Sequence, residues 1–387
     1  EDAIKLLNFD SEKEFRKYLF YISADYIQKL ASPEYKDLLE IVFMKNEEKQ
    51  VIAFNRFASN TQNLKLLQNI FPIICTTCIS AHKLGGAEPS FDMTIIDEAS
   101  QCNTAVSLVP IIRGSALMLV GDPQQLNPVI TLDVNINENL KENYTVSDDY
   151  DYISNSIYKS FLANDAVSEE ILLHNHYRCT KEIINFNNKK YYNNQLNIMC
   201  ESVISEPLVY YNVKDDCVNI KNTSQEEANR IVDYIKENPT KNIGIITPFK
   251  NQQELIEFSL KEAGLDLKKY SVGTVHKFQG DEKDSILFSL ALTDKTHPKT
   301  YDWVRNNREL INVATSRAKN KLVILSDDGV ISKLHEVTKD ENGDDLYELC
   351  EYVKSNGLYK VSQRDNVSRA LGTKPYKTEA EQEFLTT

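Results

Sequence analysis

Two adjacent carboxylates, Asp97 and Glu98, end a short apolar run in the stretch MTIIDEASQCN. At the end of a buried strand, such a pair can face a crevice. There one carboxylate holds Mg²⁺ through water and the other polarises an attacking water. An exposed acidic turn would contain the same two residues. The pair therefore indicates phosphate chemistry only if other phosphate-handling residues accompany it.

A second polar loop, GDPQQLNP, follows the apolar run ALMLV further along the chain. Gly121 and Pro123 favour a tight exit from a strand. The side-chain amide of Gln125 can donate to a γ-phosphate oxygen and accept from a water. Gly-Asp-Pro is common in ordinary turns. This loop indicates phosphate chemistry only because the carboxylate pair precedes it.

Two arginines have the chemistry to act on a phosphoryl group. Arg178 follows Tyr177 in LLHNHYRCTKEIINF, between an apolar run and an amphipathic helical pattern, and Arg317 lies in NVATSRAK, before the run NKLVILS. A guanidinium is planar and permanently charged, so it can neutralise charge that develops on a transferring phosphate. For Arg178, a surface salt bridge is the alternative. The stretch VGTVHKFQGDEKD places Gly280 and Glu282 before another apolar run.

The surrounding pattern predicts an α/β protein with two parallel-sheet domains. We expect a helical segment over residues 1–69, strand-rich residues 70–130, an exposed acidic linker over residues 131–155, a second α/β domain over residues 156–330 and a polar tail over residues 331–387 that is a candidate start of a further domain.

Short apolar runs mark the expected strands. In the first domain they are FPIICTTCIS, MTIIDEAS and ALMLVGDPQQL, which are typical of buried parallel strands; in the second they are LVYYNV, NIGIITPF, YSVGTVHKF, DSILFSLAL and NKLVILS. Between them, SQEEANRIVDYIKEN predicts a helix that begins at Ser224, with Glu227 completing a capping box.

Composition narrows the class of protein. The chain has 387 residues, of which 41% are hydrophobic, and no apolar run approaches the roughly 20 residues that span a bilayer. Seven scattered cysteines and the lack of a signal-peptide pattern predict a cytoplasmic protein with no membrane partner. The net charge of −13 argues against a chain that simply coats nucleic acid, although a local basic groove is compatible with it.

Taken in order, these stretches resemble the motifs of superfamily 1 helicases of the nonsense-mediated-decay and DNA-repair type. DEAS resembles motif II, GDPQQLNP motif III, HYR motif IV, VGTVHKFQGDEKD motif V and NVATSRAK motif VI, and ICTTCISA resembles a segment that faces nucleic acid. The resemblance covers about Ile70 to Asp327. It implies two RecA-like parallel-sheet domains, the first of them incomplete, after a helical N-terminal segment.

The resemblance also implies roles for particular residues. The catalytic residues would be Glu98 as general base, Gln125 as γ-phosphate sensor, and Arg178 and Arg317 as arginine fingers. ATP would contact Asp97 through water-bound Mg²⁺, Tyr177 through its adenine, and Gly280 and Glu282 through its ribose and phosphate edge. Single-stranded nucleic acid, DNA before RNA, would contact Thr76, Thr77, Thr274 and His276. His176 departs from the family, which usually has glutamine there.

Motif I is missing from this sequence. A phosphate-binding loop needs G-x-x-x-x-G-K-[ST], and no glycine of the chain is followed by lysine. We therefore expect that the chain starts inside the first motor domain and that its partner is the upstream half of the same motor, which would carry motif I. We also expect that this chain alone does not hydrolyse ATP. The expected function is the C-terminal portion of an ATP-dependent helicase or translocase. One alternative is a module that binds nucleic acid or a partner without hydrolysis. Another is a helicase core fused to a nuclease, because TEAEQEFL is similar to the first helix of endonuclease-like domains.

Overall fold

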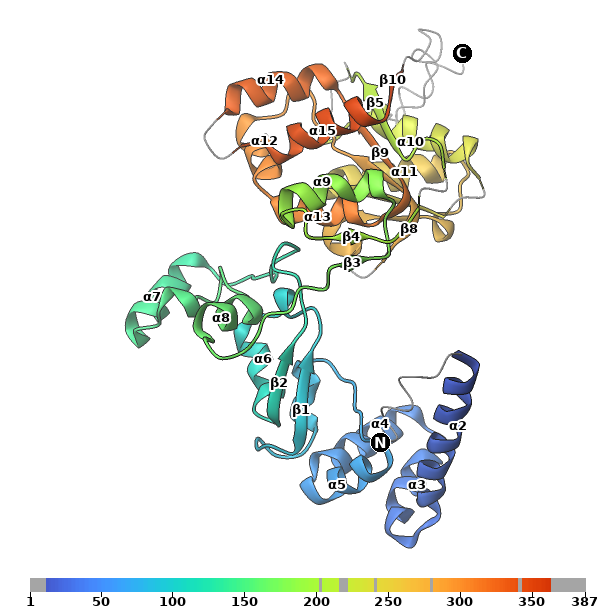
Figure 1. Ribbon diagram of the computed structural model, residues 1–387, viewed down its shortest axis with the longest axis vertical. Helices are drawn as coiled ribbons and strands as arrows, with labels where there is room; N and C mark the ends of the chain where they lie inside the picture. The colour runs from blue at the N-terminus through green and yellow to red at the C-terminus, as the bar shows by residue number, and fades with distance from the viewer. Residues whose placement is uncertain are drawn as a thin grey trace, which may run out of the picture. The chain divides into compact units, whose positions relative to one another are not determined.

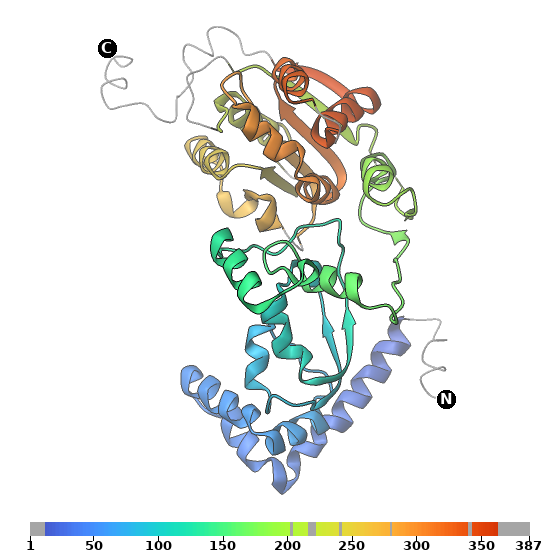
Figure 2. The same ribbon diagram turned by 90° about the vertical axis from the view of Figure 1, so that its left-hand side faces the viewer.

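The computed structural model describes residues 12–201, 204–215, 222–239, 242–278, 281–339 and 343–362. The chain divides into two compact units. Unit 1 comprises Glu1–Pro123 and Asn127–Val167, and unit 2 comprises Gln124–Leu126 and Ser168–Thr387. Figures 1 and 2 show the elements of each unit in two views. No helix among the described residues is both long enough and apolar enough to cross a bilayer.

Unit 1 begins with helices, where the apolar spacing predicted them. They are α2 (Glu12–Gln28), η1 (Lys29–Ala31), η2 (Pro33–Tyr35), α3 (Lys36–Val42), α4 (Glu47–Ser59) and α5 (Thr61–Ile70). Asn46 and Asn60 cap α4 and α5, because each side chain accepts a hydrogen bond from the first turn of its helix. The inward faces of these helices share a core that includes Tyr35, Phe57 and Leu64.

The sheet of unit 1 has two parallel strands. Its elements are η3 (Ile79–Lys83), β1 (Phe91–Ile96), η4 (Ala99–Gln101), α6 (Thr104–Ile111) and β2 (Gly114–Leu119). Ile96 of β1 lies opposite Leu119 of β2. The strand predicted for FPIICTTCIS is wrong: this stretch is irregular up to η3, and Ile73 is exposed. A strand needs a neighbour to satisfy its backbone, and none pairs with this stretch among the described residues.

The two strands of unit 1 are less buried than their sequence predicts. Met93 and Met118 are exposed, and the side chain of Ile95 has an exposed fraction of 60%. Parallel sheets in proteins are normally covered on both faces. The described part of unit 1 therefore leaves apolar surface of this sheet open.

The segment predicted as a linker, residues 131–155, contains secondary structure of its own. It forms α7 (Val134–Tyr144) and η5 (Asp148–Tyr150), and α8 (Ile157–Asn164) follows. Asp133 caps α7 by accepting a hydrogen bond from the backbone N–H of Asn135. Asp151 is buried. Polar composition alone predicted a loop here. Asp133 was an available local signal for a helix start, whereas the burial of Asp151 depends on its contacts with α7.

Unit 2 contains a six-stranded sheet in the order β10-β5-β9-β8-β6-β7. Its strands are β5 (Leu208–Val213), β6 (Ile243–Thr247), β7 (Ser271–Thr274), β8 (Lys283–Ser289), β9 (Ala318–Ser326) and β10 (Leu358–Ser362), and every pairing is parallel. The short strands β3 (Asn175–His176) and β4 (Asn197–Ile198) pair separately. The structure confirms strands within all the apolar runs predicted for this domain.

Helices cover both faces of this sheet (Figure 1). Leu322 and Ile324 of β9 pack with α9 (Lys181–Tyr191), α12 (Pro298–Arg305), α13 (Arg308–Ser316), α14 (Asp328–Thr338) and α15 (Asp345–Asn356). Val323 and Leu325 point the other way and pack with α10 (Gln225–Glu237) and α11 (Lys250–Glu262). The short helices η6 (Leu267–Lys269) and η7 (Val275–Phe278) flank β7. Successive strand residues alternate between faces, so each strand serves both cores.

The tail predicted over residues 331–387 is wrong for its first part. Strand β10 extends the sheet by pairing with β5, and Leu346, Leu349 and Cys350 of α15 are buried in the core. The many charged residues of DLYELCEYVKSN led to the prediction of a polar tail, although its apolar residues lie on one face of a helix. Residues 363–387, with TEAEQEFL, lie outside the described residues.

Half of the predicted capping box is present. Ser224 caps α10, and its Oγ accepts from the N–H of Glu227. The carboxylate of Glu227 does not return to Ser224, whose N–H donates instead to Gln252. Glu227 is buried and accepts from the N–H of Ala291 at 3.0 and 3.1 Å, with Oγ of Ser289 at 2.6 Å. This carboxyl group thus ties α10 to the end of β8.

We predict that Glu227 makes stability depend on pH. Burial raises the pKa of Glu227 from 4.5 to about 8, although hydrogen bonds from Ser289 and Ala291 oppose the shift. The folded state keeps a proton that the unfolded state releases. Stability should therefore fall as pH rises from about 4.5 to about 8, by roughly 1 kcal/mol per pH unit. Urea unfolding at several pH values should show this slope, and Glu227→Gln should remove it.

Glu254→Gln, an exposed carboxylate on α11, is the matched control and should leave the slope unchanged. An unchanged slope in Glu227→Gln would contradict the prediction.

Candidate functional site

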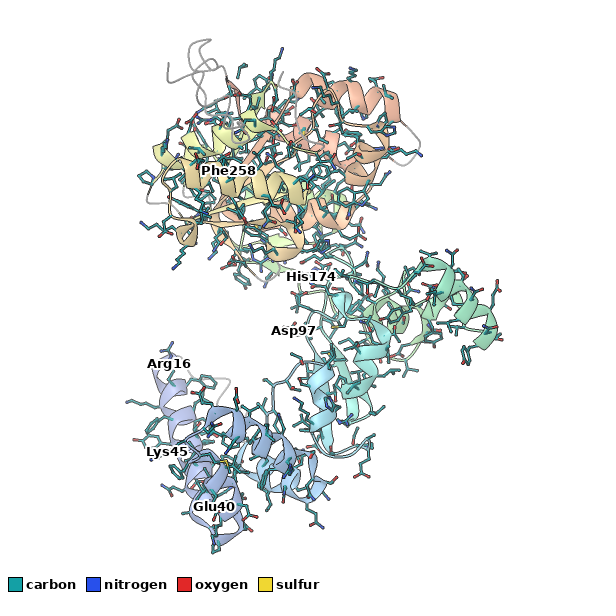
Figure 3. All side chains as sticks on the ribbon, turned by 180° about the vertical axis from the view of Figure 1, so that it is seen from behind. Arg16, Glu40, Lys45, Asp97, His174 and Phe258 are labelled. Atoms are coloured by element: carbon teal, nitrogen blue, oxygen red, sulfur yellow. The ribbon has the colours of Figure 1, made fainter. Side chains whose placement is uncertain are left out.

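The carboxylate pair lies where β1 ends. Asp97 and Glu98 follow Ile96 directly, and both are exposed (Figure 3 labels Asp97). Glu98 has φ 51° and ψ 39°, a left-handed conformation that costs a non-glycine residue roughly 1 kcal/mol. The N–H of Glu98 donates to Oδ1 of Asp97 at 2.9 Å, and Gln101 donates to Oε2 of Glu98 at 2.9 Å. The turn holds the two carboxylates in a defined arrangement.

The loop after β2 packs against this turn. Val120 donates to the carbonyl of Ile96 at 2.9 Å, and Ala99 donates to the carbonyl of Val120 at 2.8 Å. A Cβ atom on Gly121 would lie 2.8 Å from the backbone nitrogen of Ser100. Only glycine allows this approach, so Gly121 keeps the starts of the DEAS and GDPQQLNP loops together at one sheet edge.

This pair fits a magnesium ion that arrives with a nucleotide. Mg²⁺ usually keeps several waters and takes one or two carboxylates together with substrate phosphates. No group of three or more His, Cys, Asp or Glu side chains suited to a metal is found in the part of the chain that the structure describes. Asp97 and Glu98 could therefore hold Mg²⁺ together with phosphate oxygens and water, and they do not form an all-protein metal cage.

In unit 2, Glu282 binds two cations. Arg178 donates through Nε to Oε2 of Glu282 at 2.9 Å, and the ammonium of Lys319 pairs with Oε1. The hydrogen bond from Lys319, together with that from Arg178, outweighs burial and holds the pKa of Glu282 below its ordinary value. Glu282 is therefore ionised and orients both cations.

The pairing of β8 with β9 explains this cluster. Lys283 lies opposite Ala318, and the register shifts before Ser285 pairs with Lys321. Such irregularities re-aim the side chains within them. Glu282, which precedes β8, is thereby held beside Lys319 of β9.

A pocket of about 350 Å³ opens at this cluster, and it is lined by Asn175, His176, Tyr177, Arg178 and Glu282. The exposed fraction of Tyr177 is 67%, so its ring face is accessible. Nε2 of His176 accepts from the N–H of Cys179 at 2.9 Å. Burial and the nearby Arg178 lower the pKa of His176, which favours the neutral ring that this bond requires. The histidine therefore has a structural role as a local hydrogen-bond acceptor.

The second predicted arginine contacts the predicted glutamine. Arg317 follows α13 and has an exposed fraction of 2%, and its Nη2 donates to Oε1 of Gln125 at 3.1 Å. Gln125 belongs to the short stretch of unit 2 that is separate in sequence, Gln124–Leu126. Leu126 is buried in the unit 2 core, and Asn312 donates to the carbonyl of Gln124 at 2.9 Å. These contacts fix Gln125 beside Arg317.

Sequence reasoning missed Asn312 and Lys319, although they are the first and last residues of NVATSRAK. Asn312 is fully buried on α13, where its Oδ1 accepts from Asn187 at 2.6 Å and its Nδ2 donates to the hydroxyl of Tyr192 at 2.9 Å. An asparagine among the apolar positions of a helix was the available signal, because a buried amide needs partners.

The predicted residues fall into two groups. Unit 1 holds Asp97, Glu98, Thr76 and Thr77, all exposed. Unit 2 holds Gln125, Tyr177, Arg178, Glu282, Arg317, Thr274 at the end of β7 and the exposed His276. Gly280 lies outside the described residues. The structure brings Arg178 to Glu282 and Arg317 to Gln125.

Comparisons with known proteins match both parts of the chain that carry these residues. Two family models, each described as an AAA domain, match residues 40–132 and 153–329. An uncharacterized ATP-dependent helicase of Methanocaldococcus jannaschii is 26% identical over 286 residues, covering 66% of this chain and 39% of the relative. With the ordered motifs, these matches show that the chain belongs to the superfamily 1 helicases.

Two eukaryotic relatives are similar over comparable lengths. The Mus musculus DNA replication ATP-dependent helicase/nuclease DNA2 is 26% identical over 330 residues, which cover 73% of this chain and 29% of the relative. Helicase SEN1 of Saccharomyces cerevisiae is 29% identical over 291 residues, which cover 67% of this chain and 12% of the relative. The chain thus spans well under half of the length of each of these three relatives.

We predict that Asn312→Ala lowers the free energy of unfolding by about 2 kcal/mol, because it removes the hydrogen bonds that the buried side-chain amide of Asn312 makes with Asn187, the Tyr192 hydroxyl and the Gln124 carbonyl. Urea unfolding measures this change. Asn306→Ala, an exposed asparagine after α12, is the control and should change stability by less than about 0.5 kcal/mol. Equal effects of the two substitutions would show that the Asn312 network contributes little.

Proposed function

We propose that this chain is the C-terminal portion of an ATP-dependent helicase or translocase that moves along single-stranded nucleic acid. The contact of Arg317 with Gln125 carries the proposal most directly. It joins the arginine of motif VI to the glutamine of motif III inside unit 2. A γ-phosphate that competes for this amide and this guanidinium would couple nucleotide state to their packing.

The chemistry is hydrolysis of the terminal phosphate of ATP. When bound, Mg²⁺ neutralises phosphate charge. Glu98 orients and deprotonates the attacking water, and Gln125 hydrogen-bonds the γ-phosphate. Arg178 and Arg317 stabilise the charge that develops in the transition state. Because Glu282 orients Arg178 and Lys319, it keeps the guanidinium in place before the nucleotide binds.

Tyr177 supplies the stacking surface for the adenine. Its accessible ring lines the pocket at Glu282, where the ribose and phosphate edge would lie. Thr76, Thr77, Thr274 and His276 contact the single strand. The name of the mouse relative, a DNA replication protein, supports DNA over RNA as the substrate. A cytoplasmic location stays part of this proposal.

The exposed apolar surface of the β1–β2 sheet supports the proposal that further polypeptide packs against it. Met93, Ile95 and Met118 are exposed, and a parallel sheet of two strands is too small to be stable alone. We propose that further strands of the same motor, together with a phosphate-binding loop, complete this sheet. A module that binds nucleic acid without hydrolysis is the alternative.

We predict that the isolated chain hydrolyses ATP negligibly, with or without single-stranded DNA, because no G-K-[ST] loop occurs in it. A phosphate-release assay with an oligothymidine strand measures this rate. DNA-stimulated turnover by the isolated chain would contradict the prediction. Activity that is still absent when the chain is joined to a phosphate-binding loop would favour the binding module.

In a polypeptide that carries both this chain and a phosphate-binding loop, Arg317→Ala should lower kcat roughly 10³-fold, the usual contribution of an arginine finger. Arg308→Ala is the control, because Arg308 is at the opposite end of α13 from Arg317 and pairs with Asp345 of α15. Circular dichroism should show that both variants are folded. A near-normal rate in Arg317→Ala would remove Arg317 from the site.

A further inference from the structure

A groove of about 890 Å³ lies beside α7 in unit 1. It is much larger than the pocket of about 350 Å³ at Arg178. One wall is formed by Asn137, Leu140, Lys141 and Tyr144, which follow the spacing of a single helix face. The opposite side is formed by residues 129–132 and by side chains that follow α7. None of the residues that line the groove belongs to the proposed nucleotide site.

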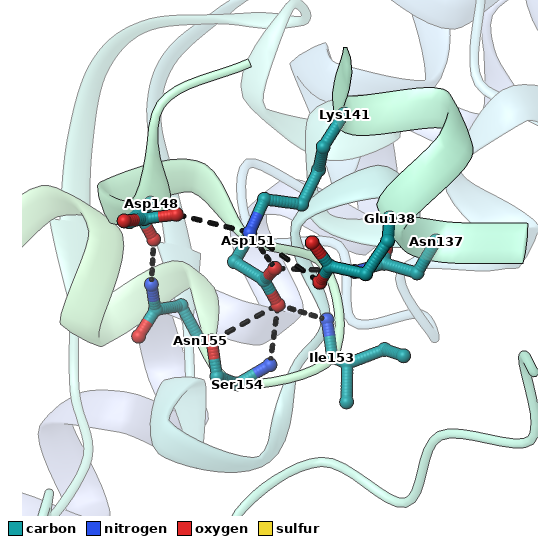
Figure 4. Close-up of polar contacts among 8 residues, drawn as sticks. All are labelled: Asn137, Glu138, Lys141, Asp148, Asp151, Ile153, Ser154 and Asn155. Atoms are coloured by element: carbon teal, nitrogen blue, oxygen red, sulfur yellow. Dashed lines mark hydrogen bonds and ion pairs between the residues drawn. The ribbon is translucent and has the colours of Figure 1, made fainter. Parts of the chain in front are cut away.

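The buried polar group beside the groove is satisfied within the protein (Figure 4). Oδ1 of Asp151 accepts from the backbone N–H groups of Ile153 and Ser154 at 2.9 Å each. Oδ2 accepts from Asn137 at 3.1 Å and pairs with Lys141 at 2.7 Å. Burial raises the pKa of Asp151, but these hydrogen bonds outweigh it and hold the pKa well below its usual range. The carboxylate of Asp151 is therefore already paired and is not available to bind a ligand.

Lys141 is the only basic residue between residues 131 and 152. Its ammonium lies 2.7 Å from Asp151, 3.0 Å from Asp148 and 3.7 Å from Glu138. These carboxylates neutralise its charge, so it is poorly placed to bind a phosphate. The same segment contains six acidic residues, namely Asp133, Glu138, Glu142, Asp148, Asp149 and Asp151, so six negative charges and one positive charge give it a net charge of −5.

Apolar and aromatic side chains are exposed in the groove. The exposed fraction is 45% for Leu140 and 76% for Tyr144, and Val129 and Tyr150 are also exposed. Covering such surface gains about 25 cal/mol for each Å² of apolar area removed from water. An exposed apolar groove with charged residues beside it is typical of a protein-binding surface.

We propose that the groove beside α7 binds a cationic amphipathic segment of a partner protein. Its apolar side chains would enter between Leu140 and Tyr144 and the opposite wall. Its lysines and arginines would pair with an acidic rim formed by Asp148 and Asp149, two exposed carboxylates next to the groove-lining residues Lys141 and Tyr150. Complementary charge selects the partner and speeds association, while the apolar anchors supply most of the affinity.

The same charges disfavour other occupants. Nucleic-acid binding rests on clustered lysine and arginine, and this segment repels phosphates. A second copy of the chain would bring a molecule of net charge −13 to an acidic surface. The inference does not depend on the proposed function, because it uses neither the nucleotide site nor the residues proposed to contact the single strand.

The test is fluorescence anisotropy with the full chain and a short labelled peptide that places leucines on one helical face and lysines on the other. Two matched peptides replace every lysine with glutamate or every leucine with serine, and a labelled oligothymidine is the fourth probe. We expect the leucine–lysine peptide to bind at least ~10-fold more tightly than the other probes. Its affinity should fall as salt screens the acidic rim.

Variants locate the binding site. The double substitution Leu140→Ser/Tyr144→Ser should weaken binding of the leucine–lysine peptide at least ~10-fold. Ile136→Ser is the control, because Ile136 is exposed on α7 but does not line the groove. Melting curves should match that of the unmodified chain, since all three side chains are exposed.

Three results would overturn the proposal: equal binding of the double variant, equal binding of the glutamate peptide or the oligothymidine, or self-association of the chain through the groove.

Discussion

The parallel pairing of β8 with β9 is the constraint on which the site of unit 2 depends. Their register places Glu282 beside Lys319, and Glu282 in turn orients Arg178. The residue before β9 is Arg317, whose backbone carbonyl accepts from Lys283 while its side chain holds Gln125. Both strands are buried on two faces, so the site rests on a rigid support.

The two units use the same kind of sheet but differ in how far they cover it. In unit 2, helices bury both faces, and alternating residues of each strand serve separate cores. In unit 1, β1 and β2 hold the DEAS turn and the start of the GDPQQLNP loop at one edge, while side chains such as Ile95 stay exposed. Asp97 and Glu98 thus follow a strand of a sheet with exposed apolar side chains, whereas Arg178 and Arg317 lie in the unit whose sheet is covered by helices on both faces.

The family assignment and the proposed docking groove concern different parts of unit 1. The family motifs place chemistry at strand ends, where backbone geometry is fixed. The groove lies in the acidic segment after GDPQQLNP, where α7 and the Asp151–Lys141 pair form a surface of opposite character to a nucleic-acid site. The two proposals therefore assign the hydrolysis of ATP and the recognition of a partner protein to separate places in unit 1.

The sequence by itself determined the family and most elements of the second domain, because apolar runs, Ser224 as an N-cap and the ordered motifs are local signals. It failed for FPIICTTCIS, the linker and the tail, where the outcome depends on neighbours. Only the tertiary structure decided that Gln124–Leu126 belongs to unit 2 and that Glu227 pairs with Ala291. These contacts join residues far apart in the chain, and strand register and burial, which no local pattern encodes, bring them together.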